Sequence, residues 1–247
     1  RIAGEINIPC GQCDLCVQGL DRHCRNMRVL GIKNYDGVFA EYAILPVGNL
    51  HIVPEKIEKE RAVFIEPLAA AFRILEQIDI SSSQRIAVLG DGKLGLLVSK
   101  VLSFSRIDHL LFGKHEEKLS LARNWTSTEL SSNFEKYDRY FDVVIDATGR
   151  KSGIEQALSL VKPEGTVFLK TTIAEKIELD LSLIAVNEVK IIGSRCGPFP
   201  KAISALEGGL EVRDLISGTF ELSDYQEAFN MASKGSLKVI LDIGSDL

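Results

Sequence analysis

The chain lacks the features that mark membrane, secreted and nucleic-acid-binding proteins. None of its apolar runs approaches the roughly 20 residues that span a bilayer, and its first residues lack the apolar core of a secretory signal. Its 34 acidic residues outnumber the 29 basic ones, which gives a formal net charge of −5, and no basic cluster offsets that charge. We therefore expect a cytoplasmic protein with no nucleic-acid or membrane partner.

Cysteine is scarce, with five residues in a chain of 247, which is too few for a disulfide scaffold of this size. Four of the five nevertheless form a C-x2-C-x2-C-x7-C array, made by Cys10, Cys13, Cys16 and Cys24. Thiolates this near in sequence can converge on one ion, which is what a closed, tetrahedral structural zinc site requires. The array therefore predicts a zinc-holding lobe.

Other interpretations of the array are weaker. An iron–sulfur run places its fourth cysteine three residues on and follows it with proline, whereas here seven residues intervene and Arg25 follows Cys24. Disulfides between C-x2-C neighbours would close small, strained rings. His23 could replace one thiolate but is more simply a solvated loop residue, and the isolated Cys196 is expected to be a small buried hydrophobe. Uncoordinated thiols remain the alternative to zinc.

From residue 85 onward, short apolar strands alternate with amphipathic helices. This alternation is typical of a parallel sheet with helices on both faces. Residues 1–53 instead contain short strands and turns, one strand covering 38–45, and residues 126–140 show no clear pattern. Further strands are expected over 85–90, 110–113, 141–148, 165–171, 189–194 and 237–243, and helices over 66–78, 93–105, 114–124, 153–161 and 224–233.

A G-x-G-x-x-G motif lies between the first of these strands and its helix. Gly90, Gly92 and Gly95 would allow a tight turn, a close approach of the backbone to a pyrophosphate, and packing of the helix on the strand. The pyrophosphate would rest on the free N–H groups and positive dipole of the helix start, near Lys93 and Leu94. A glycine-rich turn that binds nothing is the alternative interpretation.

The end of the second strand bears on the choice between NAD and NADP. Dinucleotide-binding folds place an acid there for the adenosine ribose hydroxyls, but this chain has Gly113, Lys114 and His115. A missing carboxylate removes repulsion against the 2′-phosphate of NADP, and Lys114 adds attraction, so the residues favour NADP. Glu116 or Glu117 could instead accept the ribose hydroxyls, or simply be solvated acids in a first helical turn.

Two further loops should contact the cofactor because they follow strands that end at the same sheet edge. The first carries Ala147, Thr148 and Gly149, and the second carries Thr171. Arg195 follows the last parallel strand, where it could pair with a phosphate or be a solvated surface charge.

Four ordered motifs together resemble the zinc-dependent medium-chain alcohol dehydrogenases, in the branch of the sorbitol, threonine and polyol enzymes. They are the cysteine lobe, G-V-F-A-E-Y at 37–42, E-P-L-A at 66–69 and G-x-G-x-x-G at 90–95. The resemblance implies an α/β protein, in which a Rossmann doubly wound parallel sheet is inserted in a partial, mostly β, GroES-like catalytic domain. The implied domains are 1–66 with the zinc lobe, 67–210 for the dinucleotide, and 211–247 returning to the catalytic domain.

The same resemblance implies hydride transfer between an alcohol or polyol and NAD(P), in a homodimer or homotetramer. Catalytic zinc in that family takes a cysteine, a His-Glu pair and a contact that matches Glu66, and only Glu66 has a counterpart here. We therefore expect an N-terminally truncated member that is inactive alone. The alternative is a non-catalytic, zinc-stabilised NADP-binding sensor or scaffold, and a third possibility is an iron–sulfur electron carrier.

Overall fold

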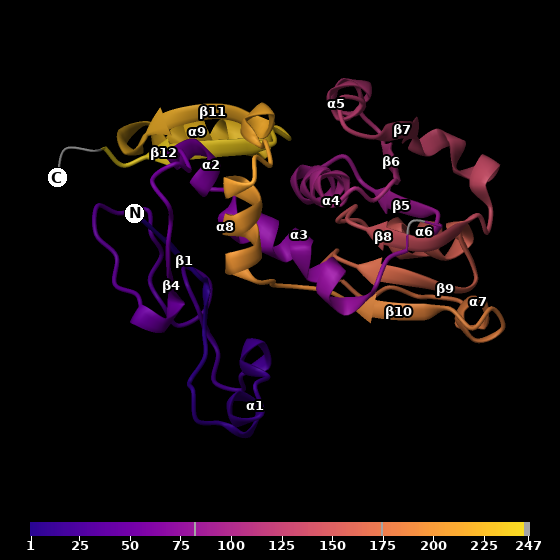
Figure 1. Ribbon diagram of the computed structural model, residues 1–247, viewed down its shortest axis with the longest axis horizontal. Helices are drawn as coiled ribbons and strands as arrows, with labels where there is room; N and C mark the ends of the chain where they lie inside the picture. Colours follow the sequence, from indigo (N-terminus) through magenta and orange to yellow (C-terminus); the bar gives the residue numbers. More distant parts are fainter. Residues whose placement is uncertain (82, 174, 245–247) are drawn as a thin grey trace. The chain divides into compact units, whose positions relative to one another are not determined.

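The computed structural model describes residues 1–81, 83–173 and 175–244. The chain forms two compact units, the first made of Arg1–Glu66 with Phe199–Leu247 and the second of Pro67–Pro198 (Figure 1). The predicted domains were 1–66, 67–210 and 211–247. The first unit resumes at Phe199, whereas the prediction placed the return to the catalytic domain at residue 211.

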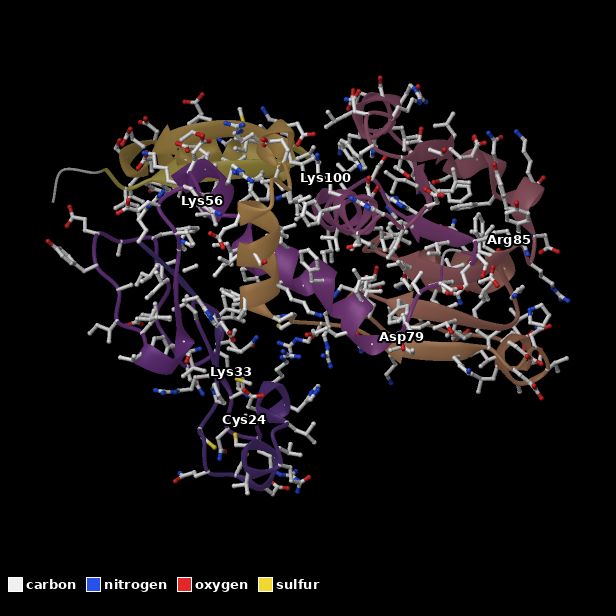
Figure 2. All side chains as sticks on the ribbon, viewed as in Figure 1. Cys24, Lys33, Lys56, Asp79, Arg85 and Lys100 are labelled. Carbon is white, nitrogen blue, oxygen red and sulfur yellow. The ribbon has the colours of Figure 1, made fainter. Side chains whose placement is uncertain are left out.

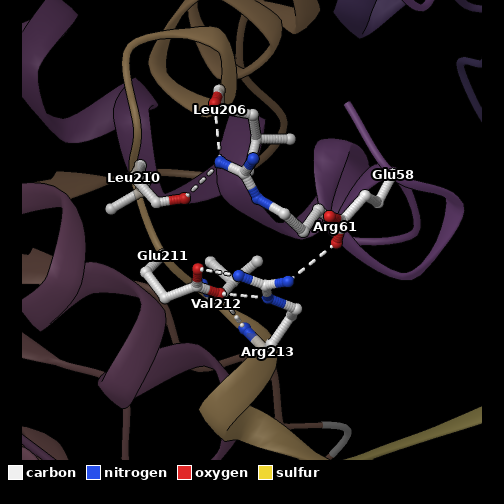
Figure 3. A network of polar contacts seen from close by, with 7 residues as sticks. All are labelled: Glu58, Arg61, Leu206, Leu210, Glu211, Val212 and Arg213. Atoms are coloured by element: carbon white, nitrogen blue, oxygen red, sulfur yellow. Dashed lines mark hydrogen bonds and ion pairs between the residues drawn. The ribbon is translucent and has the colours of Figure 1, made fainter. Parts of the chain in front are cut away.

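Helix α8 (Phe199–Glu207) accounts for this difference, because it belongs to the first unit. The guanidinium of Arg61 donates to the carbonyl oxygens of Leu206 and Leu210, at 2.6 Å and 3.0 Å (Figure 3). Beside this contact, Arg213 bridges the carboxylates of Glu58 and Glu211. The helix is thereby anchored to the segment that precedes the second unit.

The second unit is built on a six-stranded, all-parallel sheet in the order β10-β9-β8-β5-β6-β7. The chain first runs outward from β5 to β7, then returns to β8 and runs outward the other way to β10. This reversal of strand order between β5 and β8 is the doubly wound arrangement that the sequence predicted, and ligands bind at such switch points. The strands are β5 (Ile86–Leu89), β6 (Leu110–Gly113), β7 (Ser127–Leu130), β8 (Phe141–Asp146), β9 (Val161–Leu169) and β10 (Lys190–Gly193).

Strand β7 lies in the region 126–140, for which no pattern was found. Its sequence, Ser-Thr-Glu-Leu, is polar because β7 is an edge strand and is not buried on both faces. The central strand β5 is buried throughout. The hydrophobic core on this sheet includes Ala87 and Leu89 from β5, Val144 from β8 and Val167 from β9. The helices of this unit are α4 (Lys93–Phe104), α5 (Glu116–Ala122), α6 (Ser152–Leu160), α7 (Ser182–Ala185) and most of α3 (Ile65–Gln77).

The first unit consists of short elements. Strand β1 (Ile2–Gly4) pairs with β4 (Leu50–Ile52), and β2 (Asn7–Ile8) with β3 (Arg28–Val29), both antiparallel. Strand β11 (Ile216–Glu221) runs parallel to β12 (Lys238–Asp242) beside α9 (Tyr225–Ser233), and α1 (Asp14–Val17) and α2 (Lys59–Ala62) are single turns.

The predicted strand over 38–45 is wrong. Those residues form bends and irregular backbone, and Phe39, Tyr42 and Ile44 are 65%, 76% and 85% exposed. A strand needs a partner for its N–H and C=O groups, and no described strand pairs with this segment. Among the described residues, no helix is long and apolar enough to cross a membrane.

A polar cluster inside the second unit has a fixed protonation pattern. His109 Nδ1 lies 3.0 Å from the carbonyl oxygen of Ile107, so it carries the proton that this oxygen accepts. Its Nε2 therefore accepts from the hydroxyl of Ser99 at 2.7 Å, and that hydroxyl accepts the indole N–H of Trp125 at 3.0 Å. The cluster holds a neutral imidazole between α4, β6 and the segment before β7.

Acid should therefore destabilise this unit through His109. Burial lowers the pKa of His109 below its ordinary value of 6.5, so below that pH the unfolded chain binds a proton that the folded chain does not. The free energy of unfolding then falls as the pH drops below about 6.5. The free energy of unfolding can be measured in urea at about pH 7.5 and about pH 5.5. Its decrease between these pH values should be smaller for His109→Gln than for the wild type. An equal loss in both chains would contradict this assignment.

Candidate cofactor and metal sites

The four cysteines of the array meet in one cluster at the end of the first unit's lobe, around the labelled Cys24 (Figure 2). Their sulfur atoms all lie within 4.8 Å of one another, with 3.5 Å between Cys13 and Cys16 and 3.9 Å between Cys13 and Cys24. Zinc–sulfur bonds of about 2.3 Å in a tetrahedron place sulfur atoms about 3.8 Å apart. The geometry of the cluster fits a zinc ion with four thiolate ligands.

Local polar groups support negative charge on part of this cluster. The backbone N–H of Gln12 contributes most to lowering the pKa of Cys10 to about 6, whereas burial raises the pKa of Cys16 to about 12. The N–H of Cys10 also donates to the sulfur of Cys24 at 3.2 Å. Four thiols so close cannot all ionise unless a cation offsets their mutual repulsion. The donor set thus suits a divalent, thiophilic metal.

The residues around the array have other roles than ligation. Arg25 donates two hydrogen bonds of 2.7 Å to the carboxylate of Asp14 and so links the two ends of the lobe. His23 is exposed and lies outside the cluster. Cys196 is only partly buried, so the expectation of a buried hydrophobe was wrong.

The glycine motif forms a tightly packed turn between β5 and α4. Gly90 adopts a φ of +112°, and a Cβ there would lie 2.7 Å from the carbonyl oxygen of Ala147. A Cβ on Gly95 would lie 1.8 Å from the carbonyl oxygen of Gly90, so the helix can pack on the loop only without a side chain. Gly92 precedes α4 and has no described atom within 4 Å of a Cβ, which leaves its surface open to a ligand. Lys93 and Leu94 form the first turn of α4.

A cavity of about 200 Å³ opens beside this loop, at the carboxyl ends of β5, β6 and β8. The predicted residues Gly90, Gly92, Gly113, Lys114, His115 and Thr148 line it, together with Asp91, Lys118, Ser131, Arg150 and Gln156. The second group was not assigned to the site from the sequence, because Ser131, Arg150 and Gln156 come from three separate segments that only the sheet topology brings together. Asp91 is different, because it lies inside the motif itself.

The loops after β8 and β9 are joined by a buried carboxylate. Oδ1 of Asp146 accepts from the backbone N–H and the hydroxyl of Thr148, at 2.9 Å and 2.7 Å, and from the hydroxyl of Thr171 at 3.1 Å. The hydroxyl of Thr171 also accepts the N–H of Gly149 at 2.9 Å. The predicted loop residues are thus held at one sheet edge, although Ala147, Gly149 and Thr171 do not line the cavity.

Arg195 differs from the expectation of a phosphate contact. Its side chain is exposed and is not part of the cavity, while its carbonyl oxygen accepts from the buried ammonium of Lys170 at 2.9 Å. Lys170 also donates to the carbonyl of Ala70 and the hydroxyl of Ser194. The interpretation as a surface charge fits the structure better.

Glu66 lies in the first turn of α3 and is half-buried. In the part of the chain that the structure describes, the cysteine array is the one group of three or more His, Cys, Asp or Glu side chains placed to hold a metal. Glu66 is not part of that group, and the described residues do not form a catalytic zinc site around it.

Comparisons with known proteins agree with this architecture. The family described as the alcohol dehydrogenase GroES-like domain matches residues 1–55, and the one described as the glucose dehydrogenase C-terminus matches residues 59–243. D-xylulose reductase A of Aspergillus oryzae is 26% identical over 266 aligned positions, which cover 100% of this chain and 74% of that protein. A related D-xylulose reductase A from Aspergillus fumigatus is 27% identical over 95% of this chain and 71% of its own length.

Solved structures point the same way. An alcohol dehydrogenase of Escherichia coli CFT073 in complex with NADH has a TM-score of 0.90 and 27% identity, covering 98% of this chain and 77% of the other. A zinc-binding dehydrogenase from Sinorhizobium meliloti 1021 bound to NADP has a TM-score of 0.86 and 27% identity, covering 97% and 75%. The fold defines an oxidoreductase of the Rossmann and GroES-like class. The chain belongs to the zinc-dependent medium-chain alcohol dehydrogenase family.

Proposed function

We propose that this chain binds NADP for hydride transfer between a polyol and its ketose, and that its four-cysteine lobe holds a structural zinc. The observation that carries the proposal is the cavity beside the glycine loop, where Lys114, His115, Lys118 and Arg150 face one small volume. Cations of this kind suit the 2′-phosphate that distinguishes NADP from NAD. A dinucleotide bound there would lay its pyrophosphate on the start of α4, beside Gly92.

The substrate class rests on the relatives. Both curated relatives are named D-xylulose reductases, which interconvert a ketose and a polyol according to that name. Bound nicotinamide supplies the hydride acceptor or donor. This chain's own residues would hold the adenosine end, orient the pyrophosphate and, through Asp146, fix the two threonine loops beside the sheet edge. The residues that the structure describes do not supply a catalytic zinc site, so no step is assigned to such an ion.

Titration with NADPH and with NADH, followed by nucleotide fluorescence, tests the cofactor. We expect NADPH to bind about tenfold more tightly, since a charged hydrogen bond contributes about 1.5 kcal/mol or more and 1.4 kcal/mol is a factor of ten. Lys114→Glu should reverse the preference by repelling the 2′-phosphate, whereas Lys136→Glu, at an exposed lysine outside the cavity, should leave it unchanged. Tighter binding of NADH by the wild type would reject NADP.

We further propose a homodimer or homotetramer, in which β10 pairs with its copy. The supporting feature is that β10 is an edge strand with Ile191 37% exposed, and apolar edges tend to find a partner strand. A cytoplasmic location is proposed because zinc ligation needs reduced thiols, and all five cysteines are free.

A further inference from the structure

Asp91, the residue between the first two glycines of the motif, directs its carboxylate toward the turn after β6. Its side chain is only 9% exposed. Oδ2 accepts the backbone N–H of Lys114 at 2.8 Å and that of His115 at 2.7 Å, and His115 Nδ1 lies 3.0 Å from the same oxygen. One carboxylate thus binds two successive main-chain donors and one side chain of this turn.

The space for that carboxylate exists because position 113 is glycine. A Cβ on Gly113 would lie 2.6 Å from Oδ2 of Asp91 and 2.7 Å from its Cβ, which real contacts do not tolerate. Asp91 therefore occupies the volume that a side chain at the end of β6 would take. The sequence alone showed no acid at this strand end; the structure shows one that comes from the glycine loop instead.

This carboxylate borders the cavity but is mostly buried, and Oδ2 has three donors within hydrogen-bond distance. Burial by itself would raise the pKa of Asp91, but the N–H groups of His115 and Lys114 and the ring of His115 outweigh it and lower that pKa. A buried charge of this kind is stable only while its partners stay in place. The contact therefore constrains the turn as strongly as it constrains Asp91.

The constrained turn is the one that presents cations to the cavity. Strand β6 ends at Gly113 and α5 begins at Glu116, so the N–H groups of Lys114 and His115 belong to neither element. With Asp91 as their acceptor, both residues are held where they line the cavity with Arg150.

We propose that Asp91 is a positioning residue for cofactor selection: by binding the backbone of Lys114 and His115, it sets their side chains for the 2′-phosphate of NADP. This rests on the proposed NADP dependence. Asp91 borders the cavity but acts through Lys114 and His115, so its effect should be specific to the phosphorylated dinucleotide. A residue with a merely structural role would weaken NADPH and NADH binding alike.

The test measures dissociation constants of NADPH and NADH for the wild type, Asp91→Ala and Asp91→Asn. Asp91→Ala should weaken NADPH about tenfold, as expected for losing charge-assisted hydrogen bonds, and should change NADH less than about threefold. Asp91→Asn keeps an oxygen for both N–H groups and should recover NADPH affinity to within about threefold of the wild type. Melting temperatures confirm that each variant is folded.

A double-mutant cycle with Lys114→Ala measures how much of the effect of Asp91 passes through Lys114. In the Lys114→Ala background, Asp91→Ala should alter the NADPH-to-NADH ratio much less than it does in the wild type, because one of the two residues that Asp91 positions has lost its charge. A preference for NADPH that survives in Asp91→Ala, or equal losses for both nucleotides, would overturn the role of Asp91 while leaving NADP dependence intact. A wild type without any NADPH preference would overturn both.

Discussion

Alanine at Gly95 should abolish dinucleotide binding and lower the free energy of unfolding by about 3 kcal/mol or more. Its Cβ would lie 1.8 Å from the carbonyl oxygen of Gly90 and 2.8 Å from the carbonyl carbon, and both are backbone atoms that cannot rotate away. Helix α4 would have to shift from β5, which moves its N-terminus away from the pyrophosphate position. Urea unfolding and NADPH titration of the same preparation measure both effects.

Gly92→Ala is the matched control for this prediction. Gly92 has a φ of −78°, which any residue adopts, and a Cβ there would meet no described atom within 4 Å. Its stability should stay within about 0.5 kcal/mol of the wild type, while the added methyl group weakens NADPH by about tenfold or more through the pyrophosphate contact. If Gly95→Ala bound NADPH with unchanged affinity, the glycine loop would not be the cofactor site.

Removal of the metal should unfold the cysteine lobe while the second unit stays folded. The lobe has almost no apolar core: Val17 and Leu20 are 76% and 46% exposed, and helix α1 buries none of its residues. Zinc binding by small thiolate sites supplies folding free energy of about 10 kcal/mol or more, so the metal would replace the missing core. Trypsin cleavage after Arg22 and Arg25, followed by mass spectrometry, reports on this opening.

Cys24→Ser should give the same result without a chelator, since Cys24 is the most buried of the four cysteines. Cys196→Ser, which changes a cysteine outside the cluster, should retain the metal and the slow cleavage of the wild type. A lobe that resists trypsin equally well with and without a chelator would show that its fold does not depend on zinc.

Periodicity predicted the second unit well, and for a physical reason. Strands such as β5 and β8 are buried on both faces, so their sequences are continuous apolar runs that differ from the surrounding helices. Strand β7, with one exposed edge and a polar sequence, carries no such signal. The segment 38–45 shows the converse, because its residues have the composition of a strand but find no described partner in the fold.

The candidate sites also differ in how far their geometry could be predicted from the sequence. The cysteine array and the glycine loop are local in sequence, so spacing alone predicts their geometry. The cavity is assembled from loops that follow different strands, so Arg150 and Ser131 could not be placed beside Lys114 without the strand order. Asp91 lies inside the glycine motif, but only the structure shows that its carboxylate fills the space left by the missing side chain of Gly113.

We infer that these residues bind a dinucleotide and form one closed zinc site, and that Glu66 belongs to no described metal-ligand group. The zinc and iron content of the 247-residue chain, purified with its metal and measured by mass spectrometry, tests this claim most directly. We expect about one zinc per chain, no iron and a colourless protein. Two zinc ions per chain would contradict the inference by revealing a second metal site. Iron with visible absorbance would show that the four cysteines hold an iron–sulfur cluster and not zinc.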